Sequence, residues 1–376
     1  MNENIKVLHI ISSLHQGGAE RQLLELVKNN SHHAVCQLFS GGIYEKELKK
    51  NNILLFSLNV KKNILLIIAI FRLFIILKSY KPDIIHTWMY HSSLLGLLLK
   101  KITFKRNTPL IWGLRCSNMD VSKYSKILKL VIKCCKLLSK MPNIIINNSI
   151  AGLNFHKNIK FKNKNSIVIQ NGIDTDRFIS NTISRKDFRS KFKIGRYDKV
   201  LLCVGRYDPM KDHDTLLKSY RRIRKEYSST VLILAGEGTK NIKTEEGVIS
   251  LGLCEEISEV YSGSDIIISS SSFGEGFSNA IAEGMSSNLV PISTKVGDAE
   301  YIIGDVGITV APNDVFELYK AIKSIIELDN QLFLNKKVLA RERIVKKFSK
   351  LKMLYAYDKI YNQLIKDTKC AVLQEK

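Results

Sequence analysis

The feature that most constrains the fold is a regular alternation of short apolar runs with helix-periodic segments along almost the whole chain. Such alternation is typical of parallel α/β proteins, in which helices connect successive strands. The strands predicted in the first half are Lys6–Ile11, Val35–Phe39, Ile84–Thr87, Leu110–Gly113, Ile144–Asn147 and Ile167–Ile169. Those predicted in the second half are Val200–Gly205, Val231–Ala235, Val248–Leu251, Ile266–Ser269, Val290–Ser293 and Gly307–Val310. Each set fits one doubly wound sheet, so the expected architecture is two Rossmann-like α/β domains.

A chain of 376 residues is long for one hydrophobic core and suits two domains. The polar segment Asn171–Arg196 is the expected linker, and the domain limits are predicted at 1–180 and 181–350. The last segment, 351–376, is expected to pack back on the first domain as a helix, predicted over Ser349–Lys366. Its predicted apolar side is Leu351, Met353, Leu354, Tyr357, Ile360 and Leu364.

Targeting signals are not evident in the sequence. The start, MNENIKVLHIIS, lacks the regions of a signal peptide, so no export is expected. The longest apolar run, Ile64–Leu77, is shorter than the ~20 residues that span a bilayer, and Arg72 interrupts it. The seven cysteines include no C-x-x-C pair, which argues against a zinc site or disulfide framework and favours the cytosol.

The positive charge is concentrated in the first half. The chain carries +23, and residues 1–170 hold 26 Lys and Arg against 7 Asp and Glu. Compositional drift would raise both halves alike, so this asymmetry indicates an anionic partner for the first half, either a membrane surface or a nucleic acid.

A lysine stripe and an apolar helix favour the membrane. Lysines recur at steps of three or four, as on one face of a helix, at 123, 126, 129, 133, 136 and 140. Apolar residues fill the rest of that helix, and the helix predicted over Ile64–Leu77 is apolar nearly all round. A basic, apolar surface suits an anionic bilayer. The alternative is a solvated helix face packed on its own sheet.

The segment EGFSNAIAE, residues 275–283, predicts a ligand site. It follows a strand and opens a helix with Ser278 as N-cap, so that Glu275 lies in the loop and Glu283 in the second turn. Gly274 and Gly276 allow a ligand close to the backbone, and the first N–H groups of the helix suit a phosphate. An ordinary strand–helix unit with surface glutamates is the alternative.

Two cations follow another buried strand in VGRYDPMKDHDTLLKSY. Arg206 and Lys211 would hold a diphosphate at the start of the next helix, capped by Asp212 or Asp214. Two solvated surface charges would look the same in sequence.

Three weaker motifs remain. Gly17–Gly18 opens a helix and suits a phosphate or a sugar, although a plain tight turn fits equally and the pattern is not G-x-G-x-x-G. The loop at Leu253 follows a strand and is placed to meet a flat base. Asp174 and Asp176 form a D-x-D, which we interpret as a turn with Asx-type bonds rather than as a metal-ligand pair.

The motifs GGAER, NGID-x-D-x-F, VGR-x4-KDH, GEG and EGFSNAIAE, in this order, resemble those of the retaining GT-B glycosyltransferases of family four, over residues 5 to about 365. The resemblance implies an acceptor bound mainly by the first domain and a nucleotide-sugar bound mainly by the second. It implies that Arg206 and Lys211 neutralise the donor diphosphate, with Glu275, Gly276, Phe277 and Ser278 on the transferred sugar and phosphate. Glu283 would bind the ribose, Gly17 and Gly18 would line the cleft, and no metal or cofactor would be needed.

The chain departs from that family at one place. Many relatives have a histidine after the fourth strand of the first domain, where this sequence reads IWGLRCSNMD. We expect Arg115 and Asn118, with His91 nearby, to help select the sugar or an acidic acceptor.

The expected function is transfer of a hexose or N-acetylhexosamine from a nucleotide-sugar to a lipid-linked saccharide, with retention. The expected setting is bacterial surface-polysaccharide assembly (capsule, O-antigen or exopolysaccharide), on the cytoplasmic face of the cell membrane. Two rivals are a basic nucleic-acid-binding α/β protein and a catalytically silent GT-B partner subunit. The absence of a nucleic-acid motif argues against the first, and the presence of Arg206, Lys211, Glu275 and Glu283 against the second.

Overall fold

The computed structural model describes residues 5–15, 17–28, 30–59, 66–102, 107–118, 125–243 and 245–374. They divide into two compact units. Unit 1 is drawn from 1–116, 120–170 and 353–376, and unit 2 from 117–119 and 171–352. The main division at 170/171 falls earlier in the chain than the limit predicted at 180, and the C-terminal segment groups with unit 1.

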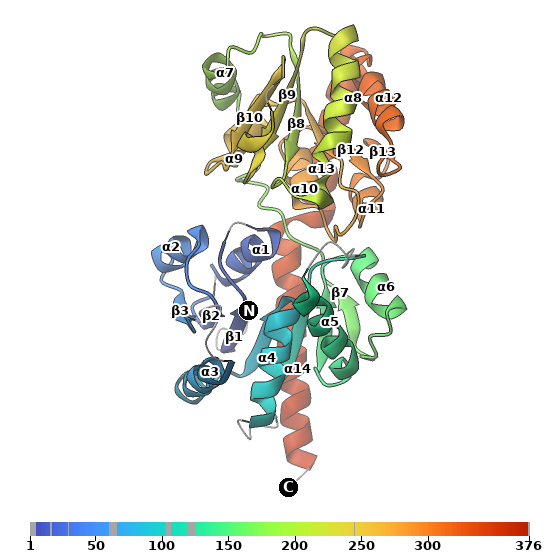
Figure 1. Cartoon of the computed structure of the whole chain (residues 1–376). Helices are drawn as coiled ribbons and strands as arrows, with labels where there is room; N and C mark the ends of the chain where they lie inside the picture. Colours follow the sequence, from blue (N-terminus) through green and yellow to red (C-terminus); the bar gives the residue numbers. More distant parts are fainter. Residues whose placement is uncertain are drawn as a thin grey trace. The chain divides into compact units, whose positions relative to one another are not determined.

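In the described part of unit 1, seven strands form a parallel sheet ordered β3-β2-β1-β4-β5-β6-β7. Figure 1 shows β3, β2 and β1 beside one another at one side of this sheet. The order reverses between β1 and β4, which is the switch point of a doubly wound sheet. The strands are β1 Val7–Ile11, β2 His33–Gln37, β3 Leu54–Ser57, β4 Ile84–Trp88, β5 Leu110–Leu114, β6 Ile144–Asn147 and β7 Ser166–Val168. The strand β3 was not predicted, although its apolar run Ile53–Phe56 is present in the sequence; it is a four-residue edge strand with partly exposed side chains.

Helices cover both faces of this sheet. Successive side chains of a strand point to opposite faces, so Trp88 of β4 packs in a core with α1, α2 and α14, while Thr87 lies against Gly96 of α4. The helix α4 contacts both α3 and α5. The helices are α1 Gly18–Val27, α2 Ile43–Lys50, α3 Leu66–Tyr80, α4 Met89–Ile102, α5 Lys126–Leu138, α6 Ile150–Asn158 and α14 Lys350–Gln374.

The C-terminal helix α14 is longer than predicted, and its predicted apolar side is buried or partly buried except at Leu351. Met353, Tyr357, Tyr361 and Leu364 are buried, whereas Leu351, predicted on the apolar side, is 73% exposed. The predicted apolar side did not include Tyr361. This residue is buried, and its hydroxyl contacts the buried polar side chain of His86.

Beneath α14, three buried histidines meet on neighbouring strands. Trp88 Nε1 donates to His9 Nδ1 (3.1 Å), so the proton of His9 is on Nε2, which faces His33 Nδ1 at 3.1 Å. The Tyr361 hydroxyl lies 2.9 Å from His86 Nδ1. Burial lowers the pKa of His33 to about 4, and burial together with neighbouring positive charge holds the pKa values of His9 and His86 well below the ordinary value.

Unit 2 is a second doubly wound sheet. Its described residues form six parallel strands in the order β10-β9-β8-β11-β12-β13, which reverses between β8 and β11. The strands are β8 Lys199–Val204, β9 Thr230–Ala235, β10 Val248–Gly252, β11 Ile266–Ser269, β12 Val290–Thr294 and β13 Ile308–Val310. The helices are α7 Thr182–Lys191, α8 His213–Glu226, α9 Ile257–Gly263, α10 Asn279–Ser286, α11 Ala299–Ile303, α12 Val315–Ile326 and α13 Asn330–Phe348.

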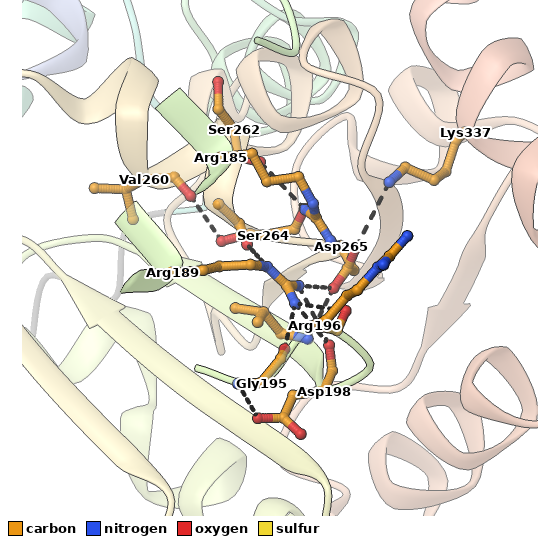
Figure 2. A network of polar contacts seen from close by, with 12 residues as sticks. Arg185, Arg189, Gly195, Arg196, Asp198, Val260, Ser262, Ser264, Asp265 and Lys337 are labelled. Atoms are coloured by element: carbon orange, nitrogen blue, oxygen red, sulfur yellow. Dashed lines mark hydrogen bonds and ion pairs between the residues drawn. The ribbon is translucent and has the colours of Figure 1, made fainter. Parts of the chain in front are cut away.

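A buried carboxylate just before β11 ties helices α7 and α13 to this sheet. Figure 2 shows Asp265 among Arg185 and Arg189 of α7 and Lys337 of α13, with N–O distances of 2.8, 2.7 and 3.6 Å. Arg189 also donates to the carbonyls of Gly263 and Asp198. Burial acts to raise the pKa of Asp265, but the three cations outweigh it and hold that pKa below its usual range.

The predicted turn at Asp174 is confirmed. Its Oδ1 accepts from the backbone N–H groups of Asp176 (3.3 Å) and Arg177 (3.1 Å). Its Oδ2 accepts from Lys350 Nζ at 2.6 Å, beside a parallel bridge between Ile173 and Ser349. The Asp174 carboxylate therefore holds two segments of unit 2 together.

Candidate active site

Two loops meet at the switch point of unit 2. The strand β8 leads into the short 3₁₀ helix Pro209–Lys211 and then α8, and its neighbour β11 leads into a run of serines and then α10. Ser270 Oγ donates to the Lys211 carbonyl (2.8 Å), and Ser272 N donates to the Met210 carbonyl (2.8 Å). These bonds fix the two loops against each other at the carboxyl edge, where ligands of open α/β sheets bind.

Lys211 and Glu275 face each other across these loops. Lys211 Nζ lies 2.5 Å from Glu275 Oε1, which also accepts from Ser271 Oγ at 2.8 Å. Glu275 is 9% exposed. Burial acts to raise its pKa, but Lys211, the Ser271 bond and the charge of Arg206 outweigh burial and hold the pKa below its usual range. The pair is therefore an ionised carboxylate bonded to an ammonium group.

Arg206 lies at the surface of the same loop. Its side chain is 55% exposed, and Nε donates to Asp208 Oδ2 at 3.1 Å. The guanidinium is near enough to lower the pKa of Glu275. The structure thus brings together Arg206, Lys211 and Glu275, which the resemblance assigned to the donor diphosphate and the transferred sugar, with Lys211 enclosed and Arg206 open to solvent.

The loop before α10 ends at Ser278, the predicted N-cap, with one difference in how the cap is made. Gly274 has φ +79°, which favours glycine. Ser278 is the N-cap of α10, but its hydroxyl makes no capping bond. Phe277 is buried and packs against Phe348 (ring centroids 5.3 Å), so its side chain belongs to the core of unit 2.

Glu283 is buried in the second turn of α10. It is 2% exposed, and its Oε2 accepts from the Tyr261 hydroxyl at 3.0 Å. Leu253 follows β10 two strands away from β8 and is 49% exposed. Of the predicted donor residues in unit 2, Leu253 thus follows the strand that is farthest from the switch point between β8 and β11.

The remaining predicted residues belong to unit 1, except Asn118. In unit 1, Gly17 is the N-cap of α1, Gly18 is its first residue, and His91 is exposed in α4. Arg115 follows β5 and stacks on Trp88, with its guanidinium carbon 4.1 Å from the ring centroid, and donates to the Tyr357 hydroxyl at 2.7 Å. Asn118 is exposed with φ +24° and groups with unit 2.

Sequence analysis missed three residues that hold the site together: Ser271, Tyr261 and Asp208. The three serines that directly follow β11, Ser270–Ser272, were a signal, because consecutive hydroxyls after a buried strand are placed to bond neighbouring loops. Within the described residues, no group of three or more His, Cys, Asp or Glu side chains is arranged to hold a metal ion.

Solved structures of other proteins have a similar fold over nearly the whole chain. The Anabaena protein HepE in complex with UDP-glucose matches with a TM-score of 0.84 over 96% of this chain and 100% of its own, at 18% identity. A glycosyltransferase from Rickettsia africae matches with a TM-score of 0.77 over 96% and 99% of the two chains, at 22% identity. The fold is GT-B, with two parallel-sheet, Rossmann-like domains.

Family models and sequence relatives agree. Residues 16–177 match "Glycosyltransferase Family 4" and residues 198–328 match "Glycosyl transferases group 1", so the chain belongs to the GT-B glycosyltransferases. A capsular polysaccharide biosynthesis glycosyltransferase, CapH of Staphylococcus aureus, is 25% identical over 78% of this chain and 82% of its own. An uncharacterized glycosyltransferase of Methanocaldococcus jannaschii is 27% identical over 70% and 69% of the two chains. This chain is similar to both proteins.

A third relative has a lipid-linked substrate in its name. It is the N-acetylgalactosamine-N,N'-diacetylbacillosaminyl-diphospho-undecaprenol 4-alpha-N-acetylgalactosaminyltransferase of Campylobacter jejuni, 27% identical over 58% of this chain and 59% of its own.

Proposed function

We propose that this glycosyltransferase moves a hexose or N-acetylhexosamine from a nucleotide-sugar to a lipid-linked saccharide, with retention and without a metal ion. The observation that carries the donor half is the Lys211–Glu275 pair at the switch point of unit 2, with Arg206 beside it. The pathway proposed is bacterial surface-polysaccharide assembly.

Breaking a sugar–phosphate bond develops negative charge on the diphosphate and positive charge near the anomeric carbon. Lys211 and Arg206 would stabilise the first, the loop at Glu275 would face the sugar, and Glu283 would accept bonds from the ribose. Preorganised charges of this kind stabilise a transition state without further reorganisation. Attack from the face that the diphosphate leaves would give retention.

The acceptor half rests partly on relatives. The Campylobacter relative is named for a diphospho-undecaprenol substrate and the Staphylococcus relative for capsule biosynthesis. We propose a similar lipid-linked saccharide, and with it a place for this protein at the cytoplasmic face of the cell membrane.

The surface of α5 supports that placement. Four large apolar side chains on one side of the helix and its end are 40–72% exposed: Ile127, Leu130, Leu137 and Met141. Four exposed lysines run beside them: Lys126, Lys129, Lys133 and Lys140. Lys136 is half-buried, and Lys123 of the predicted stripe lies outside the described residues. The alternative was a solvated helix face packed on its own sheet. Packing on the sheet does not explain these apolar side chains, because they are exposed.

The helix α3 has a similar surface. Ile68, Phe71 and Ile75 fall at helical spacing and are 41%, 62% and 50% exposed, with Lys78 exposed on the same side. The helices α3, α4 and α5 contain no Asp or Glu. No helix within the described ranges is long and apolar enough to cross a membrane. Each lysine held near an anionic bilayer contributes about 1 kcal/mol to the attraction. The exposed lysines of α3 and α5 therefore favour binding of these helices to a membrane surface.

Donor binding and transfer are tested together. A panel of nucleotide-sugars, with UDP-glucose first, is screened by thermal shift, and the donor that raises Tm is then supplied with membrane lipid extract as acceptor. Lys211→Met should lower kcat by ~10²–10³, whereas Lys218→Met, an exposed lysine of α8, should leave it unchanged. Equal rates for the two variants would refute the role of Lys211, and inverted anomeric configuration in the product would refute retention.

Membrane binding is tested by flotation with liposomes. The wild type should float with vesicles containing acidic phospholipid at low salt, and the triple variant Ile127→Ser, Leu130→Ser, Leu137→Ser should remain at the bottom. A matched control, Leu334→Ser with Val338→Ser, removes side chains of 56% and 50% exposure from α13 in unit 2 and should float normally. Failure of the wild type to bind, combined with tight RNA binding at physiological salt, would favour the nucleic-acid alternative instead.

A further inference from the structure

The carboxylate of Glu283 is held by a tyrosine from a different helix. Glu283 belongs to α10 and Tyr261 to α9, and both lie in unit 2, where their side chains are buried. The Tyr261 hydroxyl donates to Glu283 Oε2 at 3.0 Å and lies 3.4 Å from the Ala280 carbonyl. The shorter contact joins a neutral donor to a charged acceptor, which is the stronger kind of hydrogen bond.

The ring that carries this hydroxyl is itself fixed. Tyr261 is fully buried and meets Phe178 edge to face, with centroids 5.7 Å apart and an interplanar angle of 88°. The Phe178 carbonyl accepts from Ser286 Oγ of α10 at 2.7 Å and from Arg341 of α13 at 3.0 Å. Phe178, the last residue of the NGIDTDRF motif, thus packs against Tyr261 and fixes its ring. This contact is separate from the turn at Asp174.

A rigid tyrosine limits how a glutamate can lie. A glutamate has three side-chain torsions, and a carboxylate that binds two hydroxyl groups must present its oxygens in one orientation. Because Oε2 is bonded to the hydroxyl of a ring that α9 and Phe178 hold in place, the position of this oxygen is restricted before a ligand arrives. Such preorganisation removes part of the ordering cost of binding.

We propose that Tyr261 is a positioning residue for donor recognition, acting through Glu283 on the ribose hydroxyls of the nucleotide. This inference rests on the proposed function, in which Glu283 binds the ribose. Tyr261 does not touch the ligand in this scheme. It makes the site select a ribonucleotide over a nucleotide that lacks the hydroxyls.

The test compares ligands with and without those hydroxyls. Dissociation constants are measured by calorimetry for UDP and GDP and for their 2′,3′-dideoxy forms, with the wild type and Tyr261→Phe. The variant should bind the preferred ribonucleotide about three- to tenfold more weakly and should bind the dideoxy form as the wild type does. In turnover assays KM for the donor should rise while kcat changes less than twofold.

A matched control separates positioning from general loosening of the fold. Tyr220→Phe removes another buried hydroxyl of unit 2, one that donates to the carbonyls of Thr230 and Gly247. It should lower Tm without changing the ratio of ribo to dideoxy affinity. If Tyr261→Phe keeps the wild-type ratio, the positioning role is wrong even when its Tm falls.

A double-mutant cycle covers the case in which the single variant is poorly folded. In a Glu283→Gln background, Tyr261→Phe should add less than a twofold loss of ribonucleotide affinity, because the shared contact is already altered. Fully additive losses would overturn the proposal. A wild type that binds ribonucleotides without preference over dideoxy forms would refute the ribose role of Glu283, and one that binds neither UDP nor GDP would overturn the proposed function itself.

Discussion

Lys211 Nζ is bonded to Glu275, so a diphosphate that binds this lysine must compete with a carboxylate for it. Glu275→Gln keeps the shape and an oxygen for Ser271 but removes the negative charge. We therefore expect UDP or GDP to bind about three- to tenfold more tightly to this variant, while kcat falls because the sugar loses its contact with Glu275. Calorimetry and initial rates measure the two effects separately.

The control for that prediction is Glu300→Gln, which breaks an ion pair with Lys295 between side chains that are 60% and 50% exposed. It should change neither affinity nor rate. Weaker nucleotide binding by Glu275→Gln would mean that the carboxylate supports Lys211 rather than competing with the phosphates.

Asp212, next to Lys211, has a backbone conformation that most residues avoid. Its φ is +45°, and its side chain accepts from Thr215 N at 3.1 Å as the N-cap of α8. Asp212→Ala should lose the cap and keep the strain, lowering the free energy of unfolding by about 1 kcal/mol. Asp212→Asn keeps both properties and should match the wild type in urea denaturation. Equal stability of the Ala and Asn variants would contradict this assignment.

The pairing of Lys211 with Glu275 could not be predicted from sequence. Each residue was identified at the end of a buried strand, but 64 positions separate them, and the contact depends on β8 and β11 being neighbours at the switch point. Tyr261 was missed for a related reason. Its spacing marks it as a core residue, and only the position of α9 beside α10 reveals what its hydroxyl contacts.

Helix α7 and helix α13 depend on one carboxylate before β11. Asp265→Asn would leave Arg185, Arg189 and Lys337 without their anionic partner, and we expect a loss of about 3–5 kcal/mol in the free energy of unfolding. Urea denaturation at pH 7 measures it. Asp305→Asn, an exposed position, is the control and should be neutral.

The Asp265 carboxylate also predicts that the free energy of unfolding decreases at low pH. The pKa of Asp265 is lower in the folded protein than in the unfolded chain, so its contribution is complete above the unfolded value near 4 and is lost as pH falls towards the folded value. The wild-type urea midpoint should decline below about pH 4 more steeply than that of Asp265→Asn. If the urea midpoints of the wild type and Asp265→Asn decline equally with falling pH, other groups cause the loss of stability in acid.

Two strands have the predicted bounds, β6 Ile144–Asn147 and β11 Ile266–Ser269, and both are fully buried. Most other strands shift by one or two residues, including β7 and β10, which are partly exposed. The edge strand β3 was not predicted although Ile53–Phe56 is an unbroken apolar run, and its side chains are partly exposed in the structure. The helix predicted over Ile64–Leu77 is α3, Leu66–Tyr80; Ile64 and Leu65 lie outside the described residues.

The two units should respond differently to mild acid. Unit 1 contains His9, His33, His86 and His156, each buried, and burial lowers the pKa of His33 and His156 to about 4. These imidazoles are neutral when folded but bind protons in the unfolded chain below about pH 6.5. Unit 1 should therefore be fully stable above that pH and lose stability progressively as pH falls towards 4.

Tryptophan fluorescence checks this prediction selectively, because both tryptophans of the chain, Trp88 and Trp112, are in unit 1. The fluorescence melting temperature should fall between pH 7.5 and 5 by more than that of the far-ultraviolet circular dichroism signal, which reports both units. His33→Gln should flatten the dependence. A fluorescence melting temperature that is constant over this range would show that the cluster is not buried in neutral form.

Residues 353–374 complete unit 1, although residues 171–352 of unit 2 precede them in the chain. The ribosome therefore delivers the whole of unit 2 before it delivers the helix that covers the histidines of unit 1. Until Tyr357 and Tyr361 emerge, Arg115 and His86 lack partners that they have in the finished protein. During synthesis, unit 2 can fold while unit 1 is still incomplete, so the first part of the chain to be made is the last to reach its final form.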